Sequence, residues 1–568
     1  MNADQLLAHY EQIADAPDAI ARLRRFILDL AVRGKLVEQA PADEPASELL
    51  KRIAAEKARL VKAGKIKKKA ALDPMMADAP HELPENWGWV SLGTVFLYDA
   101  GAKREPKSLD PSQWLLELED IEKETGRLLN RMSVADRESK STKSQFQIGD
   151  ILYGKLRPYL TKVLVADEPG YSTTEIVAIR PIVPLCSEYC ALALRRPDFV
   201  EYVTRLGQGT KMPRLRTEDA VVSPFPLPPL AEQHRITAKV DELMALCDRL
   251  EAARVQREAT RDRLAAASLA RLNAPDPDPE TFQNHAAFAL DNLAPLTTRP
   301  DQIKALRQTI LNLAVHGKLV EQDPADEPAS ALLKRIAGEK AERVAAGLIR
   351  VQKPLEPVES NEREFGLPGN WVCVRLGEVV KLWNGLAFKS ADFGNEGIPV
   401  VRIGDLQDGA VSLSNAARVP QKIALQASEE IWIPDGALLL AMSGATTGKT
   451  AFNTTGQRLL LNQRVGRIEP FQMNIHFIRF FFETIVARNL SISLGTAIPN
   501  LSAKQINETA IPLPPLAEQH RIVAKVDELM ALCDRLEASL ATADTTRQRL
   551  LEALLHEALT PGEDQEAA

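Results

Sequence analysis

The stretch PLPPLAEQHRITAKVDELMALCDRLEA at residues 226–252 returns as PLPPLAEQHRIVAKVDELMALCDRLEA at residues 512–538. A repeat of this kind bears on the whole architecture, because each copy folds as the same unit. Apolar residues recur in both copies at steps of three and four, the pattern of an amphipathic helix, and the Pro-rich run before each copy predicts where that helix begins. We expect two matching helices of about forty residues, each roughly 60 Å long.

A second repeated block lies upstream of each interior. LRRFILDLAVRGKLVEQAPADEPASELLKRIAAEKA from Leu23 returns as LRQTILNLAVHGKLVEQDPADEPASALLKRIAGEKA from Leu306. It predicts two shorter helices, near residues 19–33 and 45–63, with Ser47 capping the second. The middle of the chain carries both blocks in series and each end carries one, so the two ends together rebuild a second middle. This arrangement predicts a pseudo-twofold axis with the long helices packed antiparallel.

Between the repeated blocks lie two segments that share edges but little else. We call residues 84–225 the first interior and residues 368–512 the second interior. They open with LPENWGWVSLG and LPGNWVCVRLG, and they close with GTKMPRLRTEDAVVSPFPLPPL and GTAIPNLSAKQINETAIPLPPL. Recent duplication with drift is the plain alternative, but drift would spread changes evenly along the chain. Near-identical frames around dissimilar contents favour two copies of one scaffold that hold different ligands.

The runs DILYGKL, KVLVAD, TEIVAIRP, IPVVRIGDL, ALLLAMSG and RVGRIEP predict strands in the interiors, and helices are expected near residues 187–206 and 475–490. The predicted fold class is mixed α/β (α+β), with two globular domains separated by long antiparallel helices in a tandem repeat. The predicted domains are an N-terminal helical region (1–83), the first interior (84–225), a central helical spacer (226–367), the second interior (368–512) and a C-terminal helical region (513–568).

Composition excludes several classes of protein. Hydrophobic residues make up 45% and charged residues 26%, as in soluble globular proteins. No signal peptide and no membrane span are expected, and five scattered cysteines argue against a disulfide framework, so we expect a cytoplasmic protein. The net charge is −7, but Lys and Arg number 19 against 20 Asp and Glu in the first interior, and 13 against 11 in the second. The acidity lies mainly outside the interiors.

The strongest enzymatic candidate is SGATTGKT at residues 443–450, which resembles a phosphate-binding loop. Its spacing fails, because the required glycine would stand at Ser443 and Gly444 comes one residue late. Cys186 and Cys190 lack further zinc ligands nearby, so we expect them in a core, as we do Cys247 and Cys533 of the repeated helix. No catalytic residues and no metal site are predicted, which favours a protein that recognises over one that catalyses.

Both interiors contain side chains suited to DNA recognition, namely cations for phosphates and Arg, Asn or Gln for base edges. A solvated polar face is the alternative for any one of them. In the first interior the candidates are Lys155, Arg157, Tyr159, Lys162, Lys211, Arg214 and Arg216. In the second they are Ser443, Thr446, Thr447, Lys449, Asn462, Gln463, Arg464, Asn500 and Lys504.

The combination resembles the specificity subunit of type I restriction-modification systems over almost the whole chain. The carriers of this resemblance are PLPPLAEQHRI with its long helix, the LRxxILxLAVxGKLV segment, the NWxxVxLG openings, GDILYGKLRP and SGATTGK. Each of these motifs is unspecific by itself, but the set is highly specific.

The resemblance implies two target recognition domains, each of which reads one half of a split, asymmetric sequence of double-stranded DNA, with the helices as a spacer. It implies a subunit that performs no chemistry and carries no cofactor. The expected partners are two modification subunits, which methylate adenine with S-adenosylmethionine, and restriction subunits, which translocate and cleave DNA with ATP and Mg. No membrane partner is expected. Partner subunits would dock on the apolar faces of the helical blocks.

Other interpretations stay open. A related system could fuse methylation and cleavage in one partner. The chain could instead be a coiled-coil scaffold whose globules bind proteins, and it would then show no salt-sensitive, sequence-selective DNA binding. A nucleotide-dependent enzyme would use Lys449. The near-neutral interiors predict weak DNA binding by this subunit alone, with partners completing a basic channel.

Overall fold

The computed structural model describes residues 16, 18–66, 80–137, 140–206, 211–274, 279–359, 362, 366–407, 409–486 and 500–559. The chain divides into two compact units. Unit 1 consists of residues 1–257 and 544–568, and unit 2 consists of residues 258–543. Both boundaries fall inside a long helix, so each unit holds one interior together with helices from both repeated blocks. The predicted bounds of the five domains stay predictions.

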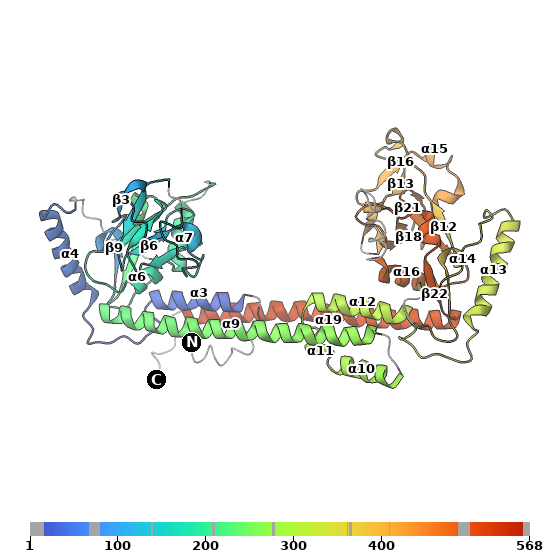
Figure 1. Cartoon of the computed structure of the whole chain (residues 1–568), viewed down its shortest axis with the longest axis horizontal. Coiled ribbons are helices and arrows are strands. Elements are labelled where there is room, and N and C mark those ends of the chain that lie inside the picture. Colours follow the sequence, from blue (N-terminus) through green and yellow to red (C-terminus); the bar gives the residue numbers. More distant parts are fainter. Residues whose placement is uncertain are drawn as a thin grey trace, which may run out of the picture. The chain divides into compact units, whose positions relative to one another are not determined.

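Unit 1 is a mixed helix-and-sheet structure whose elements alternate along the chain (Figure 1). Its helices are α3 (Ala19–Val32), α4 (Ala46–Lys62), α5 (Leu92–Val95), α6 (Ser187–Ala193), α7 (Pro197–Leu206), α8 (Thr217–Val222), the first part of α9 (Leu230–Asn273) and the last part of α19 (Leu516–Leu559). Its strands are β1 (Gly88–Ser91), β2 (Phe96–Leu97), β3 (Ala102–Arg104), β4 (Trp114–Leu116), β5 (Lys143–Phe146), β6 (Ile151–Gly154), β7 (Val163–Val165), β8 (Gly170–Ser172), β9 (Ile176–Pro181) and β10 (Pro224–Leu227).

Unit 2 has the same alternation with more strands. Its helices are the last part of α9, α10 (Pro279–Asp291), α11 (Leu293–Leu296), α12 (Pro300–Val315), α13 (Ala329–Ala345), α14 (Leu376–Val379), α15 (Gln421–Ala424), α16 (Ile475–Thr484), α18 (Ala503–Asn507) and most of α19 (Leu516–Leu559). Its strands are β11 (Val372–Arg375), β12 (Val380–Asn384), β13 (Ile398–Val401), β14 (Leu406–Gln407), β15 (Ala410–Val411), β16 (Ala417–Val419), β17 (Trp432–Ile433), β18 (Leu438–Ala441), β19 (Thr450–Phe452), β20 (Leu459–Leu461), β21 (Val465–Pro470) and β22 (Ala510–Leu513).

The two units share the strand order of one sheet, whereas their second sheets differ in strand order. Unit 1 has a four-stranded sheet in the order β2-β9-β6-β7, and unit 2 repeats it as β12-β21-β18-β19, extended by β15 and β14. A second four-stranded sheet is present in each unit, as β3-β5-β8-β4 and as β16-β13-β20-β17. The Pro-rich run before each long helix forms a two-stranded ribbon with the opening strand, as β1-β10 and β11-β22. Proline suits such a ribbon, since it has no N–H to donate to a further strand.

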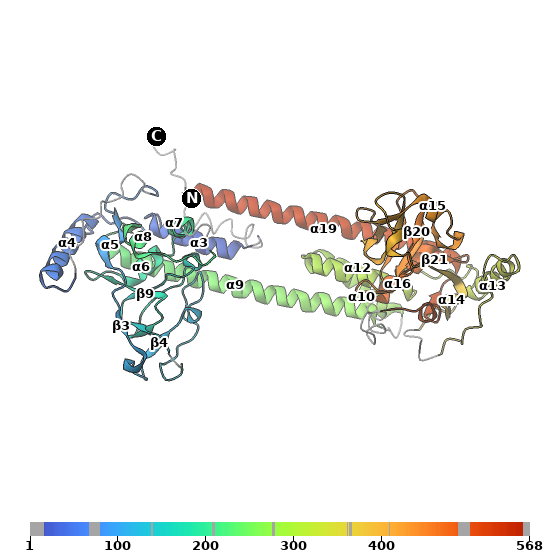
Figure 2. The same ribbon diagram turned by 90° about the horizontal axis from the view of Figure 1, so that it is seen from above.

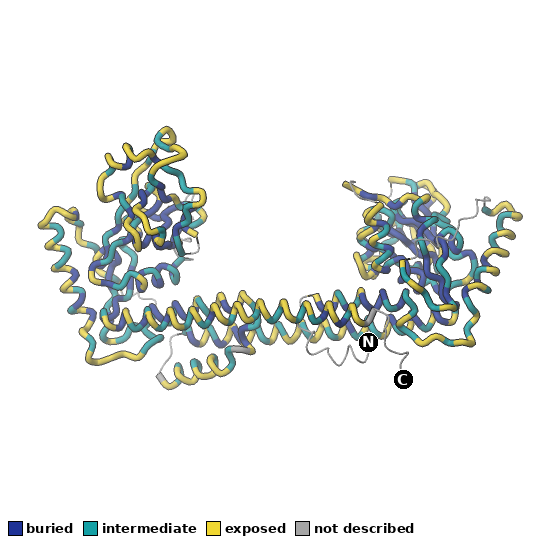
Figure 3. Tube along the Cα trace, turned by 180° about the vertical axis from the view of Figure 1, so that it is seen from behind, coloured by how far each residue is buried: buried dark blue, intermediate teal, exposed yellow. Residues whose placement is uncertain are grey.

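The core of each unit joins the sheet to the helical blocks. In unit 1 one apolar cluster includes Ile27 of α3, Leu49 and Ile53 of α4, Val177 of β9 and Ile236 of α9. Unit 2 has the corresponding cluster. Most strands of both units are largely buried, although β3 is exposed, whereas α4 and α13 bury only three residues each (Figure 3). Each interior is therefore fused to its helices by one continuous core.

Three-helix junctions tie α3 and α12 to the long helices. In unit 1, Arg24 of α3 forms ion pairs with Asp248 and Glu251 of α9, and Arg22 forms one with Glu552 of α19. In unit 2, α12 lies along α19 (Figure 2), and its Arg307 repeats the first pairing with Asp534 and Glu537. The prediction that the two chain ends combine into one helical assembly is confirmed within unit 1. The antiparallel packing and the pseudo-twofold axis relate the two units to each other and stay predictions.

Several sequence expectations are met and a few are corrected. The mixed fold class, the forty-residue helices and the predicted strands are confirmed. The helix expected over residues 187–206 is two helices, α6 and α7, because Pro197 starts a new helix. Ser47 does not cap α4, since the capping residue is Pro45 and Ser47 already lies within the helix. Of the helices in the described ranges, none combines the length and apolar character that a bilayer crossing demands.

Candidate nucleic-acid interface

The structure brings together the two candidate clusters of the first interior. Residues 155–162 leave the end of β6 as a loop, and residues 211–216 lie directly against it. The backbone N–H of Arg157 donates to the carbonyl of Pro213 at 2.8 Å. Clusters that are some fifty residues apart in sequence thus form one surface at one edge of the sheet.

The second interior gathers its three candidate clusters in the same way. Residues 443–449 follow β18, and residues 462–464 precede β21. The residue at the centre is Met442, whose N–H donates to the carbonyl of Arg464 at 2.9 Å. The carbonyl of Met442 accepts from the N–H of Leu501 at 2.7 Å. The second interior therefore presents a single polar edge built from three segments.

Both loops contain two residues with positive φ at matching places. In the first loop these are Arg157 (φ 51°) and Thr161 (φ 49°), and in the second they are Gly444 (φ 82°) and Gly448 (φ 87°). Glycine adopts this left-handed region freely, whereas Arg and the β-branched Thr do so at a free-energy cost. Strained backbone of this kind concentrates at functional sites. The first loop thus has the backbone strain that is typical of a functional loop.

The candidate side chains differ in how far they reach solvent. The exposed candidates are Arg157, Tyr159, Lys211, Arg214, Arg216, Lys449, Gln463, Arg464, Asn500 and Lys504. Lys155, Thr446 and Asn462 are half-buried. Lys162 is also half-buried, and its ammonium donates to the carbonyl of Leu118 at 2.6 Å. Ser443 and Thr447 are buried, and the Thr447 hydroxyl donates to the carbonyl of Gly444. DNA contact by any of these residues stays a prediction.

One charged neighbour in the first interior escaped the sequence interpretation. The Arg214 Nε donates to Glu175 Oε2 at 2.9 Å, and this hydrogen bond raises the pKa of the guanidinium above its ordinary value. Glu175 is the residue just before β9, some forty positions away in sequence. Nothing in the spacing could pair them, because the register of β6 against β9 had to be known first.

A second set of residues that sequence reasoning missed joins three repeated motifs. These are the long-helix block, the block upstream of each interior and the opening phrase of the interior. In unit 1 the buried carboxylate of Glu232, at the start of α9, accepts from Trp87 Nε1 at 2.9 Å and from Gln39 Nε2 at 2.6 Å. We call this set the clamp. Beside it, Arg235 forms a two-pronged ion pair with Asp43, with a shortest distance of 2.7 Å. Each partner comes from a different repeated motif, which is the signal that could have revealed the contact.

Unit 2 contains the same clamp at the same distances. Glu518 accepts from Trp371 at 2.9 Å and from Gln322 at 2.6 Å, and Arg521 pairs with Asp326 at 2.7 Å. Burial raises the pKa of Glu518, as it does that of Glu232, although the hydrogen bonds work in the opposite direction. An acid in the first turn of a helix also complements the helix dipole. The clamp therefore fixes each long helix to the opening of its interior.

The residues after Lys449 bear on the nucleotide-binding alternative. They form β19, paired with β18, where a phosphate-binding loop would lead into a helix. This segment therefore does not start a helix. The four cysteines expected in cores, Cys186, Cys190, Cys247 and Cys533, are buried. Among the described residues, no three His, Cys, Asp or Glu side chains gather as metal ligands.

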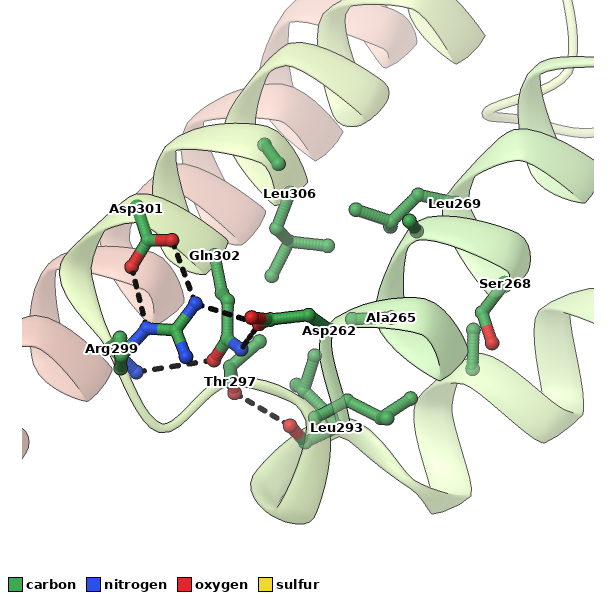
Figure 4. A pocket seen from close by; sticks show the side chains of 14 residues that line it. Asp262, Ala265, Ser268, Leu269, Leu293, Thr297, Arg299, Asp301, Gln302 and Leu306 are labelled. Atoms are coloured by element: carbon green, nitrogen blue, oxygen red, sulfur yellow. Dashed lines mark hydrogen bonds and ion pairs between the residues drawn. The ribbon is translucent and has the colours of Figure 1, made fainter. Parts of the chain in front are cut away.

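One pocket of about 280 Å³ lies within unit 2, between α9, α11 and α12 (Figure 4). Its polar groups face one another, because Asp262 accepts from Arg299 at 2.6 Å and from Gln302 at 2.9 Å. Leucines such as Leu293 and Leu306 line the rest. The pocket lies at a junction of helices, and the polar groups named here are hydrogen-bonded to one another.

Comparison with known proteins identifies the family. The family model described as "Type I restriction modification DNA specificity domain" matches residues 368–542. The chain is 34% identical to the type I restriction enzyme EcoAI specificity subunit of Escherichia coli, covering 95% of this chain and 94% of that protein. It is 33% identical to the EcoEI specificity subunit of the same organism, again covering 95% of this chain and 94% of that protein.

A solved structure supports the fold. It is titled "Structural basis underlying complex assembly and conformational transition of the type I R-M system" and matches at a TM-score of 0.51 and 20% identity, covering 84% of this chain and 99% of that chain. At this identity the likeness concerns the fold alone. The extended identity to the two Escherichia coli proteins, together with the repeated frame and the two matching loop edges, shows that this chain belongs to the family of type I restriction enzyme specificity subunits.

Proposed function

We propose that this subunit recognises a two-part, asymmetric DNA sequence and directs partner subunits to it. Each interior would read one half-site through the edge formed by its loop and the segments beside it. The observation that carries the proposal is that two interiors with one backbone arrangement present different exposed side chains, such as Arg157 and Tyr159 in one and Lys449 and Gln463 in the other. Different side chains on one frame favour different half-sites.

The helical blocks would set the gap between the half-sites. A fixed separation between two readers specifies spacing as well as sequence, as it does in other two-site DNA-binding proteins. The three-helix junctions and the two clamps support this role, because they couple each interior rigidly to α9 and α19. A loosely tethered pair of domains would tolerate several gaps.

The chemistry would lie in other subunits. Two modification subunits with S-adenosylmethionine would methylate adenine, and restriction subunits with ATP and Mg would translocate and cleave the DNA, while this chain would act in the cytoplasm without a cofactor of its own. The near-neutral charge of both interiors supports weak DNA binding by the subunit alone. Basic partner surfaces would then complete the DNA channel.

The test is a map of methylated adenines. Cells expressing the neighbouring methyltransferase with and without this chain are compared by single-molecule sequencing of their genomic DNA. A split, asymmetric motif that appears only with this chain supports the proposal. Methylation that is unchanged or absent, while the methyltransferase is demonstrably active, contradicts it and favours a protein-binding scaffold.

A further inference from the structure

The two loop edges correspond residue by residue. β6 pairs with β9 from Ile151↔Ile179, and β18 pairs with β21 from Leu438↔Ile468, in the same antiparallel sense. The first residue after each strand donates its N–H to the carbonyl of the residue that precedes the neighbouring strand. Lys155 donates to Glu175 in the first interior and Met442 donates to Arg464 in the second, both at 2.9 Å. The last residue of each strand donates its N–H to the far end of the loop at 2.9 Å. The acceptor is the carbonyl of Lys162 in the first interior and the carbonyl of Lys449 in the second.

This correspondence places Arg214 and Asn500 at one equivalent position. The isolated bridge between Leu156 and Arg214 matches the bridge between Ser443 and Asn500. The sequence agrees independently, because GTKMPR and GTAIPN put both residues sixth in the shared closing phrase. Backbone geometry and sequence frame thus give the same pairing.

Both side chains are available at the polar edge. The Arg214 side chain is 55% exposed, and Glu175 holds it through Nε at 2.9 Å. Such a contact orients the guanidinium and leaves N–H groups on both terminal nitrogens. Asn500 is also exposed. The position therefore combines a fixed backbone with two different reading groups.

The chemistry of these groups differs in a specific way. A guanidinium donates two parallel hydrogen bonds to O6 and N7 of guanine, whereas a carboxamide both donates to and accepts from N7 and N6 of adenine. We propose that Arg214 and Asn500 are equivalent specificity-determining residues, with Arg214 reading guanine in one half-site and Asn500 reading adenine in the other. This inference rests on the proposed function, and it makes Glu175 a positioning residue for Arg214.

The test exchanges the two residues. The complete complex with its methyltransferase is produced with wild-type chain, with Arg214→Asn or with Asn500→Arg, and methylated adenines in the host genomic DNA are mapped. For Arg214→Asn, preference for guanine at one position of one half-site should fall by about 5- to 150-fold, with adenine favoured instead. The other half-site and the gap should not change. Asn500→Arg should produce the converse change in the other half-site.

Two further variants separate base reading from charge and from folding. Arg214→Lys keeps the charge but replaces the planar fork with a single ammonium, so it should weaken the guanine preference without changing the favoured base. Arg52→Asn removes an Arg of α4 that is 54% exposed and paired with Glu44, and it should leave the motif unchanged. Circular dichroism and co-purification with the methyltransferase show whether each variant folds and assembles.

The outcomes that would overturn the inference are distinct from failure of the proposed function. An unchanged motif in both exchange variants would contradict base reading. A uniform loss of methylation at every site would assign Arg214 to the phosphate backbone instead. If the wild-type chain itself confers no motif, the proposed function fails before these variants are compared.

Discussion

The clamp shows how single residues couple recognition to architecture. Glu232 and Glu518 are almost completely buried carboxylates, 1% and 0% exposed, and each is satisfied by one tryptophan and one glutamine from separate repeated motifs. A buried charge is tolerated only when it is fully hydrogen-bonded. Each interior therefore depends on the helical blocks for part of its own stability.

Trp87→Phe tests this dependence. The ring stays apolar, but the N–H that serves Glu232 is lost, so we expect the free energy of unfolding of unit 1 to fall by about 1–3 kcal/mol. Urea unfolding followed by tryptophan-independent circular dichroism measures the change. Trp371→Phe is the matched variant and should produce a similar loss in unit 2. A change below about 0.5 kcal/mol in both would show that the clamp is dispensable.

A second residue-scale prediction concerns pH. Burial alone would raise the pKa of Glu469, but hydrogen bonds from Arg343 and Trp383 outweigh burial and hold it below its ordinary value of 4.5. The group therefore contributes stability that is fully present above the unfolded pKa and is lost as pH falls through the lowered folded pKa.

Glu469→Gln should thus lower the melting temperature at about pH 6 and do so less at about pH 3. Thermal unfolding of both proteins across this range measures the difference. A difference in melting temperature that stays constant with pH would show that the carboxylate's ionisation does not stabilise unit 2.

At the scale of elements, the helices α4 and α13 stand out as exposed helices attached by few buried residues. The buried residues of α4 are Ala46, Leu49 and Ile53, and those of α13 are Ala329, Leu332 and Ile336. We expect Ile53→Ala to cost at least about 2 kcal/mol, because it opens a cavity at the centre of a narrow contact.

Hydrogen exchange measures this directly. Amides of α4 should exchange at least about 30-fold faster in Ile53→Ala, whereas Arg52→Ala, on the exposed side of the same helix, should change them little. Equal effects of both substitutions would contradict attachment through the buried face.

The loops carry the other prediction at this scale. Gly444 has a φ of 82°, and a Cβ there would lie 2.9 Å from Ile403 Cδ1. We therefore expect Gly444→Ala to destabilise unit 2 by about 1 kcal/mol or more, and Arg157→Gly, at the equivalent strained position, to leave unit 1 as stable or to stabilise it. Chemical unfolding of the two variants compares them. Destabilisation by Arg157→Gly similar to that by Gly444→Ala would contradict the assigned equivalence of the loops.

The sequence predicted these elements unevenly, for physical reasons. Helical periodicity and proline punctuation placed α9 and α19, and short β-branched runs placed β6, β9, β18 and β21, because those signals are local. The pairing of Arg214 with Glu175 could not be predicted, since it depends on strand register. Ser47 was wrong as a cap because the helix already starts at Ala46, so Ser47 lies inside its first turn. The candidate loops were predicted by composition, and their side-by-side placement required the fold.

At the scale of the whole molecule, the two units are copies of one design. The strand order of the sheet that carries the loops, the loop hydrogen bonds, the clamp and the helix junction recur in both, while the exposed side chains on the loop edges differ. Membership of the specificity-subunit family gives this contrast a meaning, because an asymmetric DNA target requires two readers that differ. The central claim is that each interior reads its own half-site independently of the other.

Replacement of the second interior by a copy of the first tests that claim most directly. The measurement is the map of methylated adenines made by the complete complex in which residues 368–512 are replaced by the equivalent sequence of residues 84–226. We predict a symmetric two-part motif, in which the half-site of the first interior appears twice in opposite orientation across a gap close to the wild-type one. An assembled, active complex that still methylates the wild-type asymmetric motif, or a motif unrelated to either half-site, would contradict independent reading by the two interiors.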